Sequence, residues 1–268
     1  MTIFGILNIT ADSFSDGGKY LAPAAALARA RELVAMGADV LDLGAASSNP
    51  DSAGVAPEIE IARLAPVVAA LKADGVAISI DSFSTEVQRW ALAQGVDYLN
   101  DIQGFPDPEI HPALARARAK LIVMHSVQAR GKATRVTVPA AEIFARVERF
   151  FEGRIAALMG AGIARERLIL DPGMGFFLGT DVEASLTMLR RLGDLKNCFG
   201  LPVLVSVSRK SFVRTLAGRT PQEAGAASLA GEIFAIHQGA DHIRTHDPRA
   251  LADALAVWRA LDGPLPGA

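Results

Sequence analysis

The sequence predicts an α/β protein built as a single (β/α)8 barrel that takes up residues 1–268. Eight short apolar segments recur along the chain, each ends in polar residues, and each interval between them can hold a loop and a helix. The length of 268 residues is close to that of one such barrel and leaves little room for a second domain. Parallel strands joined by right-handed crossovers close most simply into this fold.

The apolar segments are expected to be parallel strands, because aliphatic runs without polar alternation suit strands that are covered on both faces. The clearest is Leu168-Ile169-Leu170, which stops at Asp171 and is broken by Pro172-Gly173. In chain order the strands end at Asn8, Asp42, Asp81, Asn100, His125, Asp171, Ser208 and Arg244. Since the carboxyl ends of barrel strands share one face, these polar residues are predicted to converge there.

Helices are expected between the strands. Pro23 suits the first turn of a helix and Gly37 suits a C-terminal cap, and comparable signals recur further along the chain. One expected helix begins near Glu58 and carries an apolar stripe that reaches Leu71, and the others cover residues 23–36, 85–94, 108–117, 140–159, 183–199, 222–238 and 249–261. Residues 8–18 and 45–52 are predicted to be loops at the barrel mouth. Residues 125–139 suit either a flap over the mouth or a merely solvated loop.

Composition excludes several classes of function. A net charge of -2 with no basic run argues against a nucleic-acid surface, and no apolar segment is long enough to span a membrane. The single cysteine cannot form an internal disulfide, and Met1 leads at once into the first strand without room for a signal peptide. We therefore expect a cytoplasmic protein whose partners are small molecules.

The strand-end residues fall into two chemical groups. Asp81, Asn100 and Asp171 suit a flat heterocycle with several N–H donors. Each one alone is more readily interpreted as a helix cap, but the position of all three at strand ends favours the ligand. Arg209, Lys210, Arg244 and His246 suit an oxyanion or a pyrophosphate. A glycine pattern after Asp171 is too irregular for a dinucleotide site, and His242 and His246 lie about 13 Å apart along a strand, too far to share a metal ion.

Several ordered motifs carry a resemblance to a known family. They are residues 5–18, Ser79-Ile80-Asp81, Asn100-Asp101-Ile102, Leu170-Asp171-Pro172-Gly173, Ser208-Arg209-Lys210-Ser211 and Arg244-Thr245-His246. Nearly end to end, the chain resembles dihydropteroate synthase. The resemblance implies a homodimer that condenses 6-hydroxymethyl-7,8-dihydropterin diphosphate with 4-aminobenzoate, with Mg2+ as cofactor and loss of pyrophosphate.

The resemblance also implies roles for individual residues. Asp81, Asn100, Asp171 and Lys210 match positions that hold the pterin ring, with Asp81, Asp171 and Lys210 assigned to catalysis, and Arg209 matches the position that stacks on the ring. Asn8 matches the metal position, and Arg244 with His246 matches the clamp for the leaving anion. Ser211 and Phe176 match positions that line the aminobenzoate pocket.

Two loops depart from the usual family pattern. Residues 45–51 place Asn49 where an arginine is expected, with Ser48 assigned to substrate binding, and Phe176-Phe177-Leu178 replaces a Phe-Gly-Lys pattern. These departures resemble the plasmid-borne, sulfonamide-insensitive branch of the family, with Phe177 as a further substrate-pocket residue. Two alternatives remain, a pterin-binding methyltransferase domain, which needs no pyrophosphate clamp, and a catalytically silent pterin-binding protein.

Overall fold

The computed structural model describes residues 1–10, 21–47, 54–128, 131, 133 and 135–262. Its strands are β1 (Thr2–Asn8), β2 (Val40–Gly44), β3 (Ala77–Asp81), β4 (Tyr98–Asp101), β5 (Lys120–Met124), β6 (Leu168–Asp171), β7 (Leu204–Val205) and β8 (His242–Thr245). They form one sheet in the order β6-β5-β4-β3-β2-β1-β8-β7, paired in parallel. A parallel bridge between Leu170 and Val203 brings β6 to β7 and completes the circle, so the predicted barrel is confirmed.

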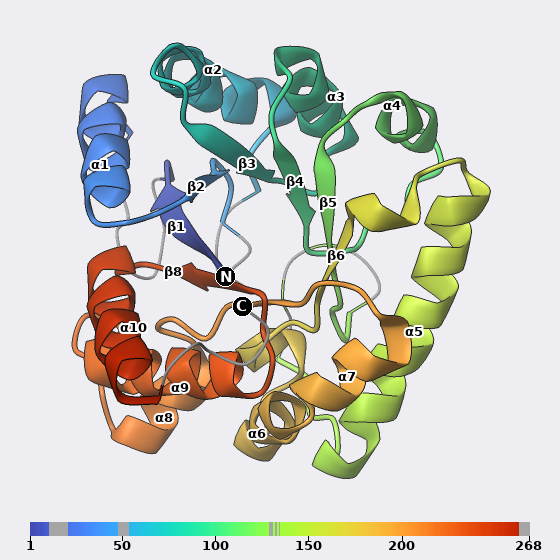
Figure 1. Ribbon diagram of the computed structural model, residues 1–268. Helices are drawn as coiled ribbons and strands as arrows, with labels where there is room; N and C mark the ends of the chain where they lie inside the picture. The colour runs from blue at the N-terminus through green and yellow to red at the C-terminus, as the bar shows by residue number, and fades with distance from the viewer. Residues whose placement is uncertain (11–20, 48–53, 129–130, 132, 134, 263–268) are drawn as a thin grey trace.

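The helices surround this circle of strands, as the view along the barrel shows (Figure 1). They are α1 (Pro23–Ala35), α2 (Pro57–Ala73), α3 (Thr85–Gln94), α4 (His111–Arg116), α5 (Ala140–Gly160), α6 (Val182–Arg190), α7 (Leu192–Phe199), α8 (Ser211–Ala217), α9 (Gly225–His237) and α10 (Pro248–Asp262), with 3-10 turns at Arg165–Arg167 and Gly175–Phe177. Most expected helices lie within a few residues of their predicted bounds.

Two expectations about helices were wrong. The helix expected over residues 183–199 is two helices, because the backbone of Arg191 (φ -111°, ψ 17°) leaves the helical region between α6 and α7. The helix after Lys210 was expected to run from Gln222 after a broken first turn, yet Ser211–Ala217 form a separate helix, α8, which is capped by Gly218 in a left-handed conformation (φ 62°). With seven residues, α8 is too short to show a helical apolar period.

Side chains alternate across each strand, and this divides the core into two parts. Outward-facing residues such as Leu41, Ile80 and Leu170 pack against the helices in the large cluster. Inward-facing residues at the amino ends of the strands form a separate cluster of Phe4, Val40, Ile122, Ile169 and Leu204. Two residues further along these strands the inward positions become polar, for example Asp42, Asp171 and Ser206. The barrel interior is therefore apolar at one end and polar at the other.

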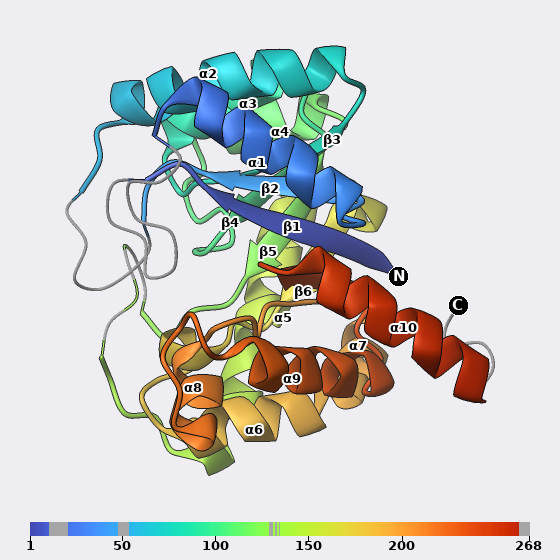
Figure 2. The same ribbon diagram turned by 90° about the vertical axis from the view of Figure 1, so that its left-hand side faces the viewer.

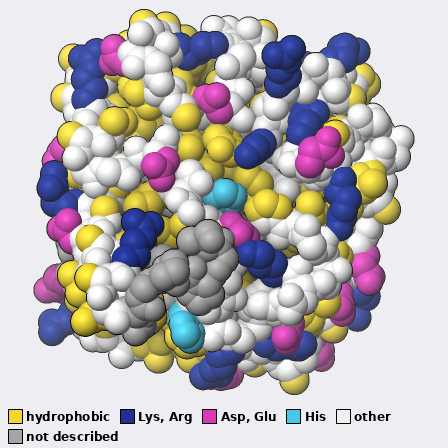
Figure 3. Space-filling view, in the orientation of Figure 1, with side chains coloured by type: hydrophobic (Ala, Val, Ile, Leu, Met, Phe, Trp, Pro, Cys, Tyr) yellow, Lys and Arg dark blue, Asp and Glu magenta, His cyan; other side chains and the backbone are white. Residues whose placement is uncertain are grey.

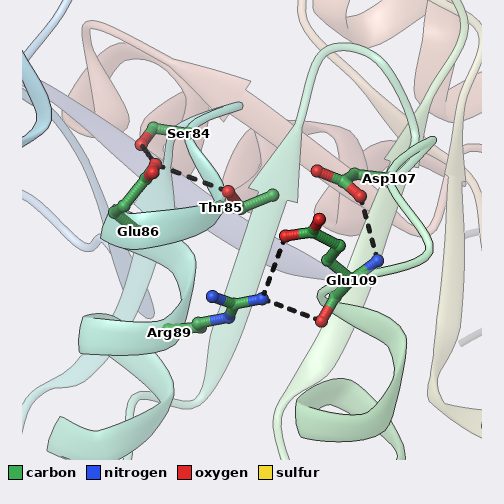
Figure 4. A network of polar contacts seen from close by, with 6 residues as sticks. All are labelled: Ser84, Thr85, Glu86, Arg89, Asp107 and Glu109. Atoms are coloured by element: carbon green, nitrogen blue, oxygen red, sulfur yellow. Dashed lines mark hydrogen bonds and ion pairs between the residues drawn. The ribbon is translucent and has the colours of Figure 1, made fainter.

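The loops between strands and helices are held by side-chain bonds to the backbone and to each other. Ser84 caps α3 by accepting from the N–H of Val87 (3.4 Å), and its hydroxyl donates to Glu86 (3.0 Å). Figure 4 shows this network, in which Arg89 also reaches the carbonyl (2.9 Å) and carboxylate (3.7 Å) of Glu109. These contacts tie α3 to the segment that leads into α4.

The two ends of the barrel differ in what they carry. In the side view of Figure 2 both chain termini lie on the right, and the strands run towards the left, where α8 lies beside the mouth. Figure 3 shows the opposite face, at the amino ends of the strands, where acidic and basic side chains are interspersed with apolar ones. Within the described residues, the helices are too short or too polar for any of them to cross a lipid bilayer.

Candidate active site

The centre of the mouth is an ion pair that spans the barrel. The guanidinium of Arg244, from β8, donates through Nε to Asp42 on β2 and through Nη2 to Asp81 at the end of β3. Asp42 is fully buried and Arg244 is 14% exposed, so the three charges interact with little screening. Burial opposes the charge on Arg244, but Asp42 and Asp81 outweigh it and raise its pKa above the ordinary value.

Asp81 and Asp171 are two of the carboxylates at the strand ends with raised pKa values. Burial raises the pKa of Asp81 to about 6, although Arg244 and Lys210 act in the opposite direction. Burial likewise raises the pKa of Asp171 to about 6, against the N–H of Gly173 and the charges of Lys210 and Arg244. Both groups are poised to change charge close to neutral pH, as is common at functional sites.

The loop after β6 is organised around Asp171. One carboxylate oxygen of Asp171 accepts from the N–H of Gly173 (2.8 Å), and its carbonyl accepts from the N–H of His125 (2.8 Å). Gly173 has φ 73° and lies so close to the carbonyl of His125 that a Cβ would stand 2.5 Å from it. The backbone therefore needs glycine here, in agreement with the Pro-Gly break in the sequence.

His125 fixes this loop from the neighbouring strand. Burial lowers its pKa to about 4, so the imidazole is neutral and its Nδ1 donates to the carbonyl of Pro172 (3.1 Å). Its ring packs edge-on against Phe150. The strand-end position of His125 was visible in the sequence, but its role as a support for the Asp171 loop was not predicted.

A tight turn follows β7. The N–H of Lys210 donates to the carbonyl of Val207 (3.1 Å), and Arg209, at the third position of the turn, has φ 58°. The hydroxyl of Ser208 contacts both the N–H (3.2 Å) and Nδ1 (3.0 Å) of His246. The turn thus links the ends of β7 and β8 and places their polar side chains side by side.

Two basic side chains at and beside this turn have lowered pKa values in the free protein. Burial together with Arg209, Arg244 and Lys210 lowers the pKa of His246 well below its ordinary value, so its imidazole is neutral at pH 7. Burial and Arg244 lower the pKa of Lys210 to about 8, against the attraction of Asp171 and Asp81. In the free protein, His246 therefore offers an N–H donor rather than a positive charge.

One cavity at the mouth brings most of the predicted residues together. Its lining includes Asn8, Asp81, Phe176, Phe177, Arg209, Lys210, Ser211, Arg244 and His246. Asn100 and Asp171 are not part of this lining but lie buried beside it, 1% and 3% exposed. Ser48 and Asn49, with most of the predicted loops at residues 8–18 and 45–52, lie outside the described residues.

Asn100 and Ser206 point to a polar ligand in the barrel. The side-chain oxygens Oδ1 of Asn100 and Oγ of Ser206 are buried and have no hydrogen-bond partner among the described residues. A buried polar atom without a partner costs about 1–3 kcal/mol, which a ligand with matching donors relieves. Ser206 was not assigned to the site from the sequence, and Asp42 was placed at the mouth as a strand end but given no role. Their inward direction, two residues beyond the apolar layer, was the signal that they belong to it.

The two aromatic residues after β6 differ in position. Phe177 is 5% exposed and packs with Ile102, Met124 and Ala133, and the ammonium of Lys210 lies 5.0 Å from its ring centre. Phe176 is less buried and lies beneath the guanidinium of Arg135, 6.0 Å from its ring centre. Phe177 therefore both packs beneath its loop and lines the cavity.

Comparison with known proteins agrees with this geometry. Residues 4–246 match the family described as pterin binding enzyme. The chain is 60% identical over 261 residues to the dihydropteroate synthase type-2 of Escherichia coli, covering 97% of this chain and 96% of the relative. This chain belongs to the dihydropteroate synthases of the pterin-binding enzyme family.

Solved structures of dihydropteroate synthases share the fold. The enzyme of Xanthomonas albilineans with 4-aminobenzoic acid has a TM-score of 0.88 and 37% identity, covering 98% of this chain and 93% of the other. The same enzyme in complex with 7,8-dihydropteroate has a TM-score of 0.83 and 36% identity, covering 98% and 94%. These relatives are synthases, which favours the synthase over the methyltransferase alternative.

Proposed function

We propose that this dihydropteroate synthase condenses 6-hydroxymethyl-7,8-dihydropterin diphosphate with 4-aminobenzoate and resists sulfonamides. The observation that carries the reaction is the polar inner layer of the mouth, where Asp81, Asn100, Asp171 and Lys210 surround one end of the barrel in a chain of this family. In the condensation the bond between the pterin methylene and the diphosphate oxygen breaks. The aminobenzoate nitrogen then bonds to that carbon and loses a proton.

The pterin ring is proposed to bind in the barrel. Its aminopyrimidine edge presents N–H donors, and the carboxylate of Asp171 with the free amide oxygen of Asn100 would accept from them. Lys210 would donate to a ring acceptor, and Asp81 would favour the positive charge that develops as the diphosphate leaves. Because these groups are buried, their bonds are less weakened by water than bonds at the surface.

The diphosphate is proposed to lie at the turn after β7. Arg209 and His246 line the cavity beside Lys210, and Arg244 keeps further N–H donors besides the two that hold Asp42 and Asp81. A neutral His246 can donate one N–H to the anion. Arg244→Lys, which keeps the charge but not the fork, is expected to lower kcat more than it weakens 4-aminobenzoate binding.

Mg2+ is proposed as the cofactor. This ion is commonly held by one or two protein oxygens together with substrate phosphates, and Asn8 offers an amide oxygen on the cavity wall. One amide oxygen suits an ion whose other ligands are diphosphate oxygens and water, and such an ion would neutralise the departing anion.

The aminobenzoate pocket is proposed to lie between the loop after β6 and the start of α8. Phe176, Phe177 and Ser211 line this side of the cavity. A sulfonamide shares the aniline ring of 4-aminobenzoate but carries a bulkier tetrahedral group at the acid end. An additional aromatic wall at Phe177 would exclude the larger group and admit the planar carboxylate, which is discrimination by repulsion.

Formation of dihydropteroate from the two substrates tests the proposed reaction. Purified protein should form dihydropteroate and pyrophosphate with Mg2+ and lose most of this activity in excess EDTA. A protein that binds the pterin diphosphate without turnover would instead be the silent binding protein. Activity that persists fully in EDTA would remove Mg2+ from the mechanism and leave the condensation itself in place.

A homodimer and a cytoplasmic location complete the proposal. Phe234 on α9 and Val257 on α10 are 41% and 61% exposed, and the two helices pack side by side on the barrel surface. Two exposed apolar side chains on neighbouring helices are compatible with contact to a second copy of the chain. Analytical ultracentrifugation tests the dimer, and cell fractionation tests the location.

A further inference from the structure

The turn after β7 carries backbone strain at one residue. Arg209 has φ 58°, a left-handed conformation, and it occupies the third position of a turn closed by Lys210 N–H and the carbonyl of Val207 (3.1 Å). Glycine is the usual residue at this position of such a turn, because a Cβ is disfavoured there. A non-glycine residue persists in this conformation only when its surroundings hold it, and such residues cluster at functional sites.

The support for Arg209 comes from α9, an element outside the cavity. The N–H of Arg209 donates to Oγ of Ser228 (2.9 Å), and the hydroxyl of Ser228 itself donates to the carbonyl of Ala224 (2.6 Å). Because its one hydrogen is committed to Ala224, Ser228 presents only lone pairs to Arg209. The orientation of this hydroxyl is therefore fixed for accepting the Arg209 N–H.

The same face of α9 lies directly against the turn. Gly231 is three residues after Ser228, and a Cβ at Gly231 would stand 3.2 Å from Cγ2 of Val207. Residues three apart lie on one face of a helix, so Gly231 allows the close approach and Ser228 makes the bond. Ser228 is 4% exposed, so water does not readily replace its oxygen.

We propose that Ser228 is a positioning residue for substrate binding, which acts by holding Arg209 in its left-handed conformation at the mouth. The hydroxyl of the preceding residue, Ser208, holds His246, so the whole turn is fixed on both sides, by α9 and by β8. This arrangement fixes the backbone from which the side chains of Arg209 and Lys210 line the cavity. The proposal rests on the proposed function, because it assigns Arg209 to the pterin diphosphate.

Ser228→Ala tests this role, since alanine fills nearly the same space and removes only the acceptor. We expect the Kd of the pterin diphosphate, measured by calorimetry, and its KM to rise about tenfold, with kcat changing less. Ser228→Thr, which keeps the hydroxyl, should recover most of the affinity. Asp241→Asn is the control for a general loss of stability. Asp241 accepts from the N–H of Val203 (2.9 Å), just before β7, and from Lys196 (2.6 Å), so this variant should lower Tm without changing Kd.

A double-mutant cycle separates positioning from general stability. If Ser228 acts through Arg209, then Ser228→Ala should add little to the loss of affinity in Arg209→Ala. A Kd for Ser228→Ala equal to that of the wild type, or losses that simply add in the double variant, would overturn the proposal. Because binding is measured directly, this outcome is distinct from a failure of the proposed reaction, which would show as wild-type protein without dihydropteroate formation.

Discussion

At the scale of single residues, the mouth of the barrel buries three carboxylates beside its cations. Burial raises the pKa values of Asp81 and Asp171, and the charge of Asp42 adds to this effect. A ligand that brings N–H donors and later positive charge stabilises these carboxylates in their ionised form. Burial of the carboxylates thus destabilises the free protein, and the same carboxylates stabilise the bound ligand.

The substitution Asp171→Asn separates the effect of this carboxylate on ligand binding from its effect on stability. The variant should bind the pterin diphosphate about 10- to 100-fold more weakly, because a charge-assisted acceptor becomes a neutral amide. The free energy of unfolding of the variant should not fall. The pKa of Asp171 is raised to about 6 in the folded protein, so its favourable contribution to stability is present at low pH and is lost as pH rises through about 6.

Thermal unfolding should therefore show Asp171→Asn to be as stable as the wild type or more stable at pH 7.5, by up to roughly 2 kcal/mol. Titration calorimetry measures the binding. Wild-type affinity in the asparagine variant would remove Asp171 from pterin recognition, whereas a large fall in Tm would show that the carboxylate mainly supports the fold.

Phe177→Gly tests the origin of sulfonamide resistance. Removing the ring opens the cavity wall beside Lys210, so inhibition by sulfamethoxazole should become at least about tenfold stronger at matched 4-aminobenzoate saturation. The substitution also empties part of a buried cluster, at a cost of roughly 3–5 kcal/mol. Phe83→Ala is the control, because Phe83 packs on the same cluster and does not line this cavity.

Wild-type protein as sensitive as an ordinary dihydropteroate synthase would end the resistance proposal. If Phe177→Gly is as resistant as the wild type, the resistance has a cause other than Phe177. Greater sensitivity in both Phe177→Gly and Phe83→Ala would point to a general loosening of the cluster.

At the scale of elements, the strands were predictable from the sequence and some helices were not. The run Leu168 to Leu170 has no polar alternation because its outward face meets helices and its inward face meets the other strands. The division between α6 and α7 depends on the backbone at Arg191, and α8 depends on packing against the loop after β6. Neither has a strong local signal such as proline or an apolar period.

The residues of the candidate site were likewise predictable in part, where they lie at the ends of strands. Residues at strand ends, such as Asp81 and Arg244, could be assigned because barrel topology places strand ends together. The support from Ser228 and His125 could not, because each acts through a backbone contact that only the three-dimensional arrangement reveals. The neutral state of His246 likewise depends on neighbours that are distant in sequence.

The ion pair between β8, β2 and β3 should stabilise the barrel measurably. Arg244→Met would leave Asp42 fully buried without its cation, so the free energy of unfolding at pH 7 should fall by about 3–5 kcal/mol. Adding Asp42→Asn to this variant should recover a substantial part of that loss. Denaturant titration of the single and double variants gives both values, and a double variant no more stable than Arg244→Met would show that the loss is one of packing rather than charge.

At the scale of the whole molecule, the barrel sets the pH range in which the mouth can work. Its strands bring two carboxylates with pKa values near 6 and a lysine with a pKa near 8 into one buried region, although they come from β3, β6 and the turn after β7. The carboxylates accept hydrogen bonds fully only when ionised, and the lysine is a cation only when protonated. The competent charge state is therefore most populated between the two values.

We expect kcat/KM for the pterin diphosphate to follow a bell-shaped pH profile, rising through about pH 6 and falling through about pH 8. The acidic limb belongs to Asp81 and Asp171, and each titrates in the field of Asp42, Lys210 and Arg244. Lys210→Arg should move the alkaline limb to higher pH, since a guanidinium does not lose its proton in this range. Initial rates from pH 5 to 10 for the two proteins measure this directly. An alkaline limb that stays in place in Lys210→Arg would assign it to another group, such as the substrate itself.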